Sequence, residues 1–149
     1  YFLGSRFRQV KEIRDSGKDI VQDRTIYEDA HIFAENLNDM KLLSDRDFNN
    51  YSSVFNLMKS FVSAPDLLIY LRSDVPNLVK KIYKRGRDYE ASISIEYLTK
   101  LNQKYEKWIN SYDEGKLLII DVDDLDFVER PEDFGFILEK IEAELHGLF

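Results

Sequence analysis

Short apolar runs that alternate with helical stretches constrain this fold more than any other feature of the sequence. Residues Asp66–Leu71 are predicted to form one buried strand, and Leu117–Val122 another. The segment Asp19–Asp23, which carries Ile20 and Val21, is a third strand candidate. Strands separated by helical crossovers predict an α/β fold with a parallel sheet flanked by helices. Such a sheet binds ligands at the carboxyl ends of its strands, so the chemistry is expected there.

Between these runs, apolar side chains recur at three- and four-residue steps, which is typical of amphipathic helices. Thr25 and Glu28 have the spacing of a capping box, and Ser44 precedes two acidic residues that favour a helix start. Ser73 or Asp74 is expected to cap the next helix, which Gly86 ends. The long helix predicted to begin after Ser44 has an apolar stripe, formed by Val54, Leu57, Met58, Phe61 and Val62. The predicted helices cover residues 1–16, 25–37, 45–62, 74–86, 94–112 and 131–145.

Composition narrows the class of protein. The 149 residues fit one domain, and 21 basic against 28 acidic side chains give a net charge of −7, which argues against a general nucleic-acid binder. Cysteine is absent and only two histidines occur, so thiolate chemistry is excluded and a multi-histidine metal site is not expected. No apolar run approaches the roughly 20 residues of a membrane span. We therefore expect a cytoplasmic protein that acts on small molecules.

Two charged groups are candidates for binding a phosphorylated ligand. Asp23 and Arg24 stand just before the capped helix, where a carboxylate could hold Mg²⁺ and a guanidinium could grip a phosphate, or the two could form an internal ion pair. Residues 80–87 hold five cations in eight positions, which suits a polyphosphate but is also typical of a helix C-terminus. Asp29 and Phe33 share one helix face and could bind a base, or they could serve the helix start and the core.

Four segments, taken in order, resemble the deoxynucleoside kinase family, with the bacterial deoxyadenosine/deoxyguanosine kinases nearest. Asp23-Arg24-Thr25 resembles the family's Asp/Glu-Arg-Ser/Thr motif, and Pro65–Leu71 resembles its next core strand. Residues 81–90 resemble the arginine-rich lid, expected over about 81–93, and 95–108 resemble the helix after it. The resemblance implies a P-loop nucleoside-kinase-like fold over 1–149, with ATP and Mg²⁺ as cofactors.

The resemblance also implies a role for individual residues. Asp23 matches an acid that helps to hold Mg²⁺, and Arg24 matches an arginine near the sugar 5′-hydroxyl. The lid cations Lys81, Arg85 and Arg87 match residues around the transferred phosphate. The substrate-binding matches are Arg6 and Asp29 at the base, Phe33 stacked on it and Glu90 at the sugar 3′-hydroxyl. The loop 123–127 matches the segment that lines the adenine of ATP, with Asp123, Asp124 and Phe127 as its candidate contacts.

Two departures from the family pattern qualify these roles. Position 81 is lysine where arginine is frequent, which keeps the charge and loses the planar fork. No G-x-x-x-x-G-K-[ST] phosphate loop occurs in this sequence, and the general base would precede Tyr1. The expectation is a C-terminal portion of a longer kinase, inactive by itself and lacking the N-terminal strands.

The predicted reaction is transfer of the ATP γ-phosphate to the 5′-hydroxyl of a purine deoxynucleoside, in nucleotide salvage. The alternatives are another nucleotide kinase, such as a thymidylate kinase, or a non-catalytic α/β binding module if the chain is complete. The helices over 27–37 and 45–62 carry more apolar side chains than one core requires, and family members dimerise there. The expected partners are the deoxynucleoside, ATP and a second copy of the chain, without nucleic acid or membrane.

Overall fold

The computed structural model describes residues 2–87 and 93–147, which form two compact units. The first unit contains residues 1–63 with 104–108, and the second contains 64–103 with 109–149. The prediction of one domain over 1–149 stays a prediction.

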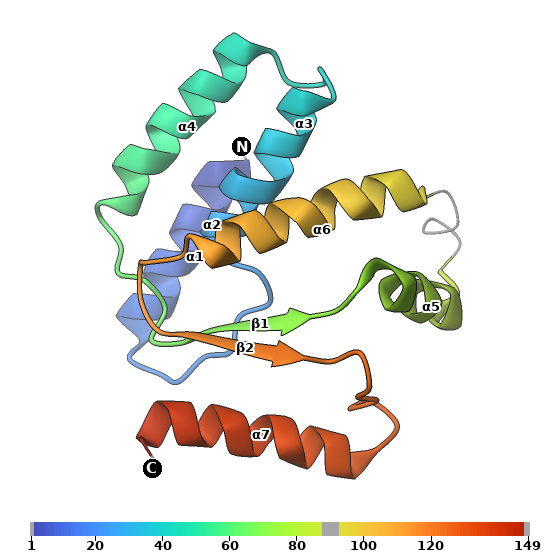
Figure 1. Ribbon diagram of the computed structural model, residues 1–149. Helices are drawn as coiled ribbons and strands as arrows, with labels where there is room; N and C mark the ends of the chain where they lie inside the picture. The colour runs from blue at the N-terminus through green and yellow to red at the C-terminus, as the bar shows by residue number, and fades with distance from the viewer. Residues whose placement is uncertain (1, 88–92, 148–149) are drawn as a thin grey trace. The chain divides into compact units, whose positions relative to one another are not determined.

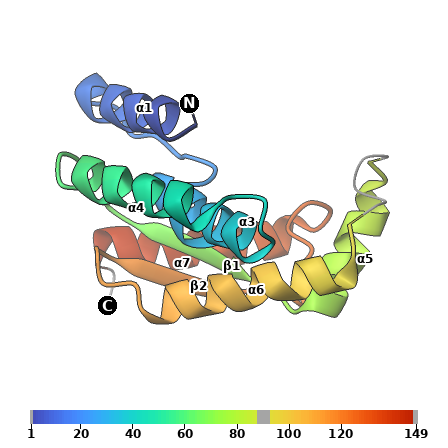
Figure 2. The same cartoon turned by 90° about the horizontal axis from the view of Figure 1, so that it is seen from above.

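The first unit is helical (Figure 1). Helix α1 (Phe2–Ser16) ends at Gly17, whose φ of 61° requires the left-handed region that glycine tolerates. The next helix is continuous through three segments: α2 (Ile26–Glu28), the π-helical turn η1 (Asp29–Ala34) and α3 (Glu35–Asp39). Helix α4 (Asp45–Lys59) follows, and it lies beside α3 in both views (Figures 1 and 2).

The core of the first unit gathers apolar side chains from several of these helices. Ile26 and Ile32 are almost fully buried, and Phe55 of α4 is 3% exposed. His31 lies against two aromatic rings, edge-on to Phe55 at 5.6 Å and stacked with Trp108 at 6.2 Å between centroids. These contacts hold the helix that carries Asp29 in place.

The second unit contains the sheet. Strands β1 (Leu68–Arg72) and β2 (Leu117–Asp121) pair in parallel, with Leu68 opposite Leu117 and Arg72 opposite Asp121. The crossover between them holds α5 (Val75–Arg85) and α6 (Ile95–Asn110), the latter contributing 104–108 to the first unit. Helix α7 (Pro131–His146) lies along the sheet (Figure 1). Ile137 of α7 packs with Ile120 and Val122 to form the centre of this unit's core.

Most of the predicted elements are confirmed, including the parallel pairing, but the strand predicted over 19–23 and the predicted end of the helix after Ser44 are wrong. Residues 19–23 form no strand in the part of the chain that the structure describes, and Val21 is 99% exposed. Much of the predicted apolar stripe faces solvent, which agrees with the expectation that this segment carries more apolar side chains than one core requires: Val54, Leu57 and Phe61 are 48%, 62% and 72% exposed, whereas Phe55 is buried. The helix also ends at Lys59 rather than residue 62. Across the described residues, no helix is both long and apolar enough to cross a membrane.

Candidate functional site

The start of the α2 helix is fixed by a reciprocal capping box. The backbone N–H of Tyr27 donates to the Thr25 hydroxyl oxygen at 3.2 Å, and Glu28 Oε2 accepts the Thr25 backbone N–H at 2.7 Å and the Thr25 hydroxyl as well. The Glu28 carboxylate is thus buried and used by the fold. This cap sets the point at which the chain leaves Asp23 and Arg24 and enters the helix.

Arg24 adopts a backbone conformation that is rare for a residue with a side chain. Its φ is 63°, and its guanidinium carbon lies 4.8 Å from the centre of the Phe33 ring, in cation–π contact. The residue therefore lies beside the aromatic ring that the resemblance assigns to base stacking. Asp23, the predicted magnesium ligand, is exposed beside it.

A partly buried ion pair joins α1 to the π-helical turn. Arg6 Nε lies 3.1 Å from Asp29 Oδ2, and the two side chains are 24% and 11% exposed. Arg6 also donates from Nη1 to Gln9 Oε1 at 3.1 Å. Asp29 is the first residue of the turn η1, and such π-helical turns occur frequently at functional sites. The pair presents a hydrogen-bond donor and an acceptor side by side.

Two tyrosines near these carboxylates were missed by the sequence reasoning. Burial raises the pKa of the Tyr105 phenol to about 12, and the negative charges of Glu28, Asp23 and Asp29 add to this shift against the opposing charge of Arg24. Burial together with Asp29 likewise raises the pKa of Tyr51 to about 12. The helical spacing of Tyr105 in α6 predicts only a core residue, since no local signal reports the distant carboxylates.

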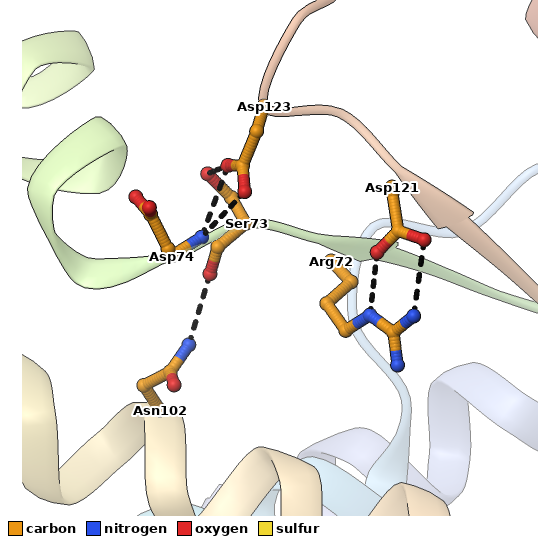
Figure 3. Close-up of polar contacts among 6 residues, drawn as sticks. All are labelled: Arg72, Ser73, Asp74, Asn102, Asp121 and Asp123. Carbon is orange, nitrogen blue, oxygen red and sulfur yellow. Dashed lines mark hydrogen bonds and ion pairs between the residues drawn. The ribbon is translucent and has the colours of Figure 1, made fainter.

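In the second unit, polar residues meet at the carboxyl ends of β1 and β2, as expected for a parallel sheet. Arg72 pairs with Asp121 through two contacts, Nε–Oδ1 at 2.5 Å and Nη2–Oδ2 at 3.0 Å (Figure 3). Ser73 Oγ donates to Asp123 Oδ1 at 2.6 Å, and Asn102 Nδ2 donates to the Ser73 carbonyl at 3.1 Å. The sequence pattern predicts Ser73 only as a possible helix cap and does not indicate its contact with Asp123.

Two lysines of α5 contact the predicted adenine loop in this unit. Lys81 Nζ donates to the Val122 carbonyl at 2.9 Å and lies 5.9 Å from the centre of the Phe127 ring. Lys84 Nζ is 3.1 Å from Asp126 Oδ2, and this contact lowers the pKa of Asp126. The Asp124 side chain is exposed, and its backbone carbonyl accepts a hydrogen bond from Arg130 at 2.7 Å. The N-terminal part of the predicted lid is therefore attached to the loop after β2.

The remaining lid residues follow at the end of α5. Arg85 is exposed in its last turn, and Gly86 closes the helix with a φ of 65°. Arg87 is exposed beyond this glycine. Glu90 lies outside the described residues, as do the other positions of the expected lid from 88 to 92.

The magnesium expectation rests on one carboxylate. Within 2–87 and 93–147, no group of three or more acidic or histidine side chains is gathered as a metal site. Mg²⁺ usually keeps several waters and binds through one or two carboxylates plus substrate phosphates, so a single exposed Asp23 fits a nucleotide-bound ion. Asp23, Arg24, Arg6, Asp29 and Phe33 belong to the first unit, and the lid and the adenine loop belong to the second. Their convergence on one nucleotide stays a prediction.

Comparisons with known proteins identify the family to which this chain is similar. A family model described as "Deoxynucleoside kinase" matches residues 1–146. The deoxyadenosine/deoxycytidine kinase of Bacillus subtilis is 34% identical over 148 residues, which cover 98% of this chain and 68% of that protein. The deoxyadenosine kinase of Dictyostelium discoideum is 41% identical over 109 residues, 73% of this chain and 44% of that protein.

Solved structures show the same relationship. The deoxyadenosine kinase of M. mycoides, with the products dCMP and a flexible dCDP bound, superposes with a TM-score of 0.77 at 30% identity. The match covers 96% of this chain and 71% of that one. The same enzyme with dATP bound gives a TM-score of 0.74 at 32% identity, over 95% of this chain and 71% of that one.

The fold is thus that of the nucleoside kinases, which are phosphotransferases. The chain belongs to the deoxynucleoside kinase family. The predicted fold class and family are confirmed, and the comparisons do not favour a thymidylate kinase or a non-catalytic module.

Proposed function

We propose that the full-length protein transfers the γ-phosphoryl group of ATP to the 5′-hydroxyl of a purine deoxynucleoside, with deoxyadenosine as the preferred acceptor. The observation that carries the proposal is the Arg6–Asp29 ion pair. Adenine offers an amino donor, N6, next to a ring acceptor, N7, which matches a carboxylate and a guanidinium side by side. The names of the B. subtilis and M. mycoides relatives support this choice.

In this proposal the two groups of residues divide the work. Phosphoryl transfer depends on positioning and on neutralising the charge of the transferred group. Phe33 stacks on the base, and Arg24 and Asp23 lie at the sugar 5′ end, with Glu90 at the 3′-hydroxyl. Lys81, Arg85 and Arg87 surround the phosphates, and residues 123–127 line the adenine of ATP. Mg²⁺ held at Asp23 would supply further charge neutralisation on the phosphates.

The test is a radiolabelled transfer assay on the full-length protein with γ-labelled ATP. Deoxyadenosine, deoxyguanosine, deoxycytidine and thymidine are compared as acceptors, and thymidine monophosphate separates a thymidylate kinase. We expect deoxyadenosine to give more labelled product than the other acceptors. ATP binding without transfer to any deoxynucleoside would overturn the proposal.

Variants at the base site sharpen the assay. Removing one partner of a buried charge pair leaves the other unpaired, so Asp29→Asn is expected to lower kcat/KM for deoxyadenosine by at least about tenfold. The matched control is Arg8→Ala, an exposed cation on the same helix as Arg6, which should leave kcat/KM unchanged within about twofold. Equal effects from both variants would remove the base-reading role of the pair.

We also propose a cytoplasmic homodimer that buries the exposed apolar side chains of α4 and of the residues just after it. Val54, Leu57 and Phe61 are all at least 48% exposed, and exposed apolar clusters mark association sites. Light scattering on the full-length protein should give a dimer, and Leu57→Lys should shift it toward the monomer. A monomer at micromolar concentration in the unaltered protein would contradict this assembly.

A further inference from the structure

The Asp123 carboxylate oxygens accept hydrogen bonds from other groups of the protein. Its Oδ1 accepts the Ser73 hydroxyl at 2.6 Å and the Asp74 backbone N–H at 3.0 Å, and its Oδ2 lies 3.3 Å from the same N–H (Figure 3). Ser73 is 5% exposed, whereas Asp123 is at the surface. The hydrogen bond from Ser73, followed by that from Asp74, holds the pKa of Asp123 below its usual range. A carboxylate with these contacts is ionised at neutral pH and oriented.

These contacts join three elements of the second unit. Asp74 is the N-cap of α5 and itself accepts the Asn77 backbone N–H at 2.7 Å. Asp123 therefore attaches the loop after β2 to the N-cap of α5, called here the lid helix because it carries Lys81 and Arg85, and a negative charge at this end also favours the helix dipole. Asn102 of α6 donates to the Ser73 carbonyl at 3.1 Å and holds the serine from the other side (Figure 3).

The same loop meets α5 again farther along the helix. Lys81 lies seven residues after Asp74, about two turns or 10 Å along the axis. It donates to the Val122 carbonyl at 2.9 Å, and Lys84 pairs with Asp126 at 3.1 Å. A helix attached to the loop at two separated points cannot shift or rotate against it without breaking one of them. The attachment at Asp123 therefore determines where Lys81 and Lys84 stand on the loop.

We propose that Asp123 is a positioning residue, which through Ser73 and the Asp74 N–H fixes the lid helix on the loop 122–127 and does not itself contact the adenine. The inference rests on the proposed ATP-binding role of this loop. It replaces the expectation that the Asp123 side chain lines the adenine, and leaves that task to the loop backbone and Phe127. It also gives Ser73, which lies outside the loop, a role in ATP binding.

The two roles of Asp123 predict different behaviour of Ser73 variants in the full-length kinase. If Asp123 positions the lid helix, Ser73→Ala and Asp123→Ala should each raise the KM for ATP by about tenfold, which is the effect of losing a hydrogen bond to a charged group. The KM for deoxyadenosine should stay within about twofold. Because both variants weaken the same attachment, the double variant should raise the KM for ATP about as much as Asp123→Ala alone. Independent effects would instead multiply.

Two controls separate positioning from general structural damage. Ser73→Thr keeps the hydroxyl and should restore the KM for ATP to within about twofold. Asp113→Ala removes the same charge from an exposed residue of the loop before β2 and should change neither KM. Loss of folded protein alone would lower kcat and leave the KM for ATP unchanged, and that pattern would overturn the inference.

A second readout does not depend on catalysis. Amide hydrogen exchange in the first turn of α5 should be faster in Ser73→Ala and Asp123→Ala than in the unaltered protein and in Asp113→Ala. Unchanged exchange, or a Ser73→Ala variant with the ordinary KM for ATP, would overturn the positioning role. An unaltered protein that transfers no phosphate to any deoxynucleoside would instead overturn the proposed function, so the two failures are distinguishable.

Discussion

Lys104 of α6 is the residue of the first unit whose replacement should be most informative about its stability. Its side chain is 12% exposed, and Nζ lies 3.1 Å from Glu35 Oε1 and 2.6 Å from Asp39 Oδ2. Both acids belong to α3, so one ammonium group ties the end of that helix to α6. Lys104→Met keeps an unbranched side chain of similar length and removes the charge.

The magnitude follows from the exposure of the three side chains. Glu35 is 32% exposed and Asp39 is 59% exposed, so both carboxylates regain water when the lysine is removed. The cost is therefore below the about 3–5 kcal/mol of breaking a fully buried pair. It is above the about 0.2–1 kcal/mol of an exposed pair, because the lysine side chain itself is nearly buried. We expect a loss of about 2 kcal/mol in the free energy of unfolding.

The pH dependence of this loss has a definite sign. Burial acts to lower the pKa of Lys104, but its hydrogen bonds with Asp39 and Glu35 and their charges outweigh burial, and the pKa is raised above 10.5. A lysine whose pKa is raised in the folded state binds its proton more tightly there than in the unfolded chain. Its contribution is therefore fully present below pH 10.5 and is lost as the pH rises through the folded-state pKa.

The assay is urea unfolding of the full-length protein, followed by the fluorescence of Trp108, which is buried in the same unit. Lys107→Met is the matched control, since Lys107 is on the same helix, 78% exposed and 3.6 Å from Glu35. It should cost no more than about 0.5 kcal/mol. Equal losses for the two variants, or a Lys104→Met effect that persists above the folded-state pKa, would refute the reasoning.

Three further predictions concern a cap, the core and a buried phenol. Thr25→Ala should lower the free energy of unfolding in urea by about 1–2 kcal/mol, because it removes the acceptor for the Tyr27 N–H, whereas Thr25→Ser should retain most of the stability. Ile120→Ala should cost about 3–4 kcal/mol, since Ile120 is 2% exposed, and a loss below about 1 kcal/mol in urea unfolding would show that the site collapses. Tyr105→Phe should remove a tyrosinate step near pH 12 from the ultraviolet titration. It should also reduce the loss of stability between about pH 10 and 12, where the unfolded state releases the phenolic proton before the folded state does.

Helix ends were predictable because their chemistry is local. The capping box at Thr25, the caps at Ser44 and Asp74 and the left-handed Gly86 all occur where the sequence predicts them. Each depends on residues within three or four positions of one another, so the sequence contains the whole interaction. The strands β1 and β2 were predictable for a similar reason, since a short apolar run between helical stretches suits a covered parallel strand.

The errors arise where the answer depends on distant partners. Residues 19–23 have an apolar pair, but a strand needs a hydrogen-bonded neighbour, and five residues cannot reveal whether one exists. The same limit applies to α4, since it has apolar side chains on two faces and periodicity alone does not decide which of them the core covers. In the structure Phe55 is buried and Leu57 is exposed. The Ser73–Asp123 contact joins residues 50 positions apart, beyond any local pattern.

Backbone strain at Arg24 adds a physical argument to the resemblance that first singled this residue out. A positive φ costs a residue with a side chain of the order of 1 kcal/mol or more, and glycine, asparagine or aspartate would occupy the position with less strain. Arg24 nevertheless holds a φ of 63° immediately before the Thr25 cap. The contact with Phe33 offsets part of this cost, since an exposed cation–π pair contributes about 0.5–1 kcal/mol. The fold alone thus gains little from an arginine here, which supports the proposal that its guanidinium serves the nucleotide.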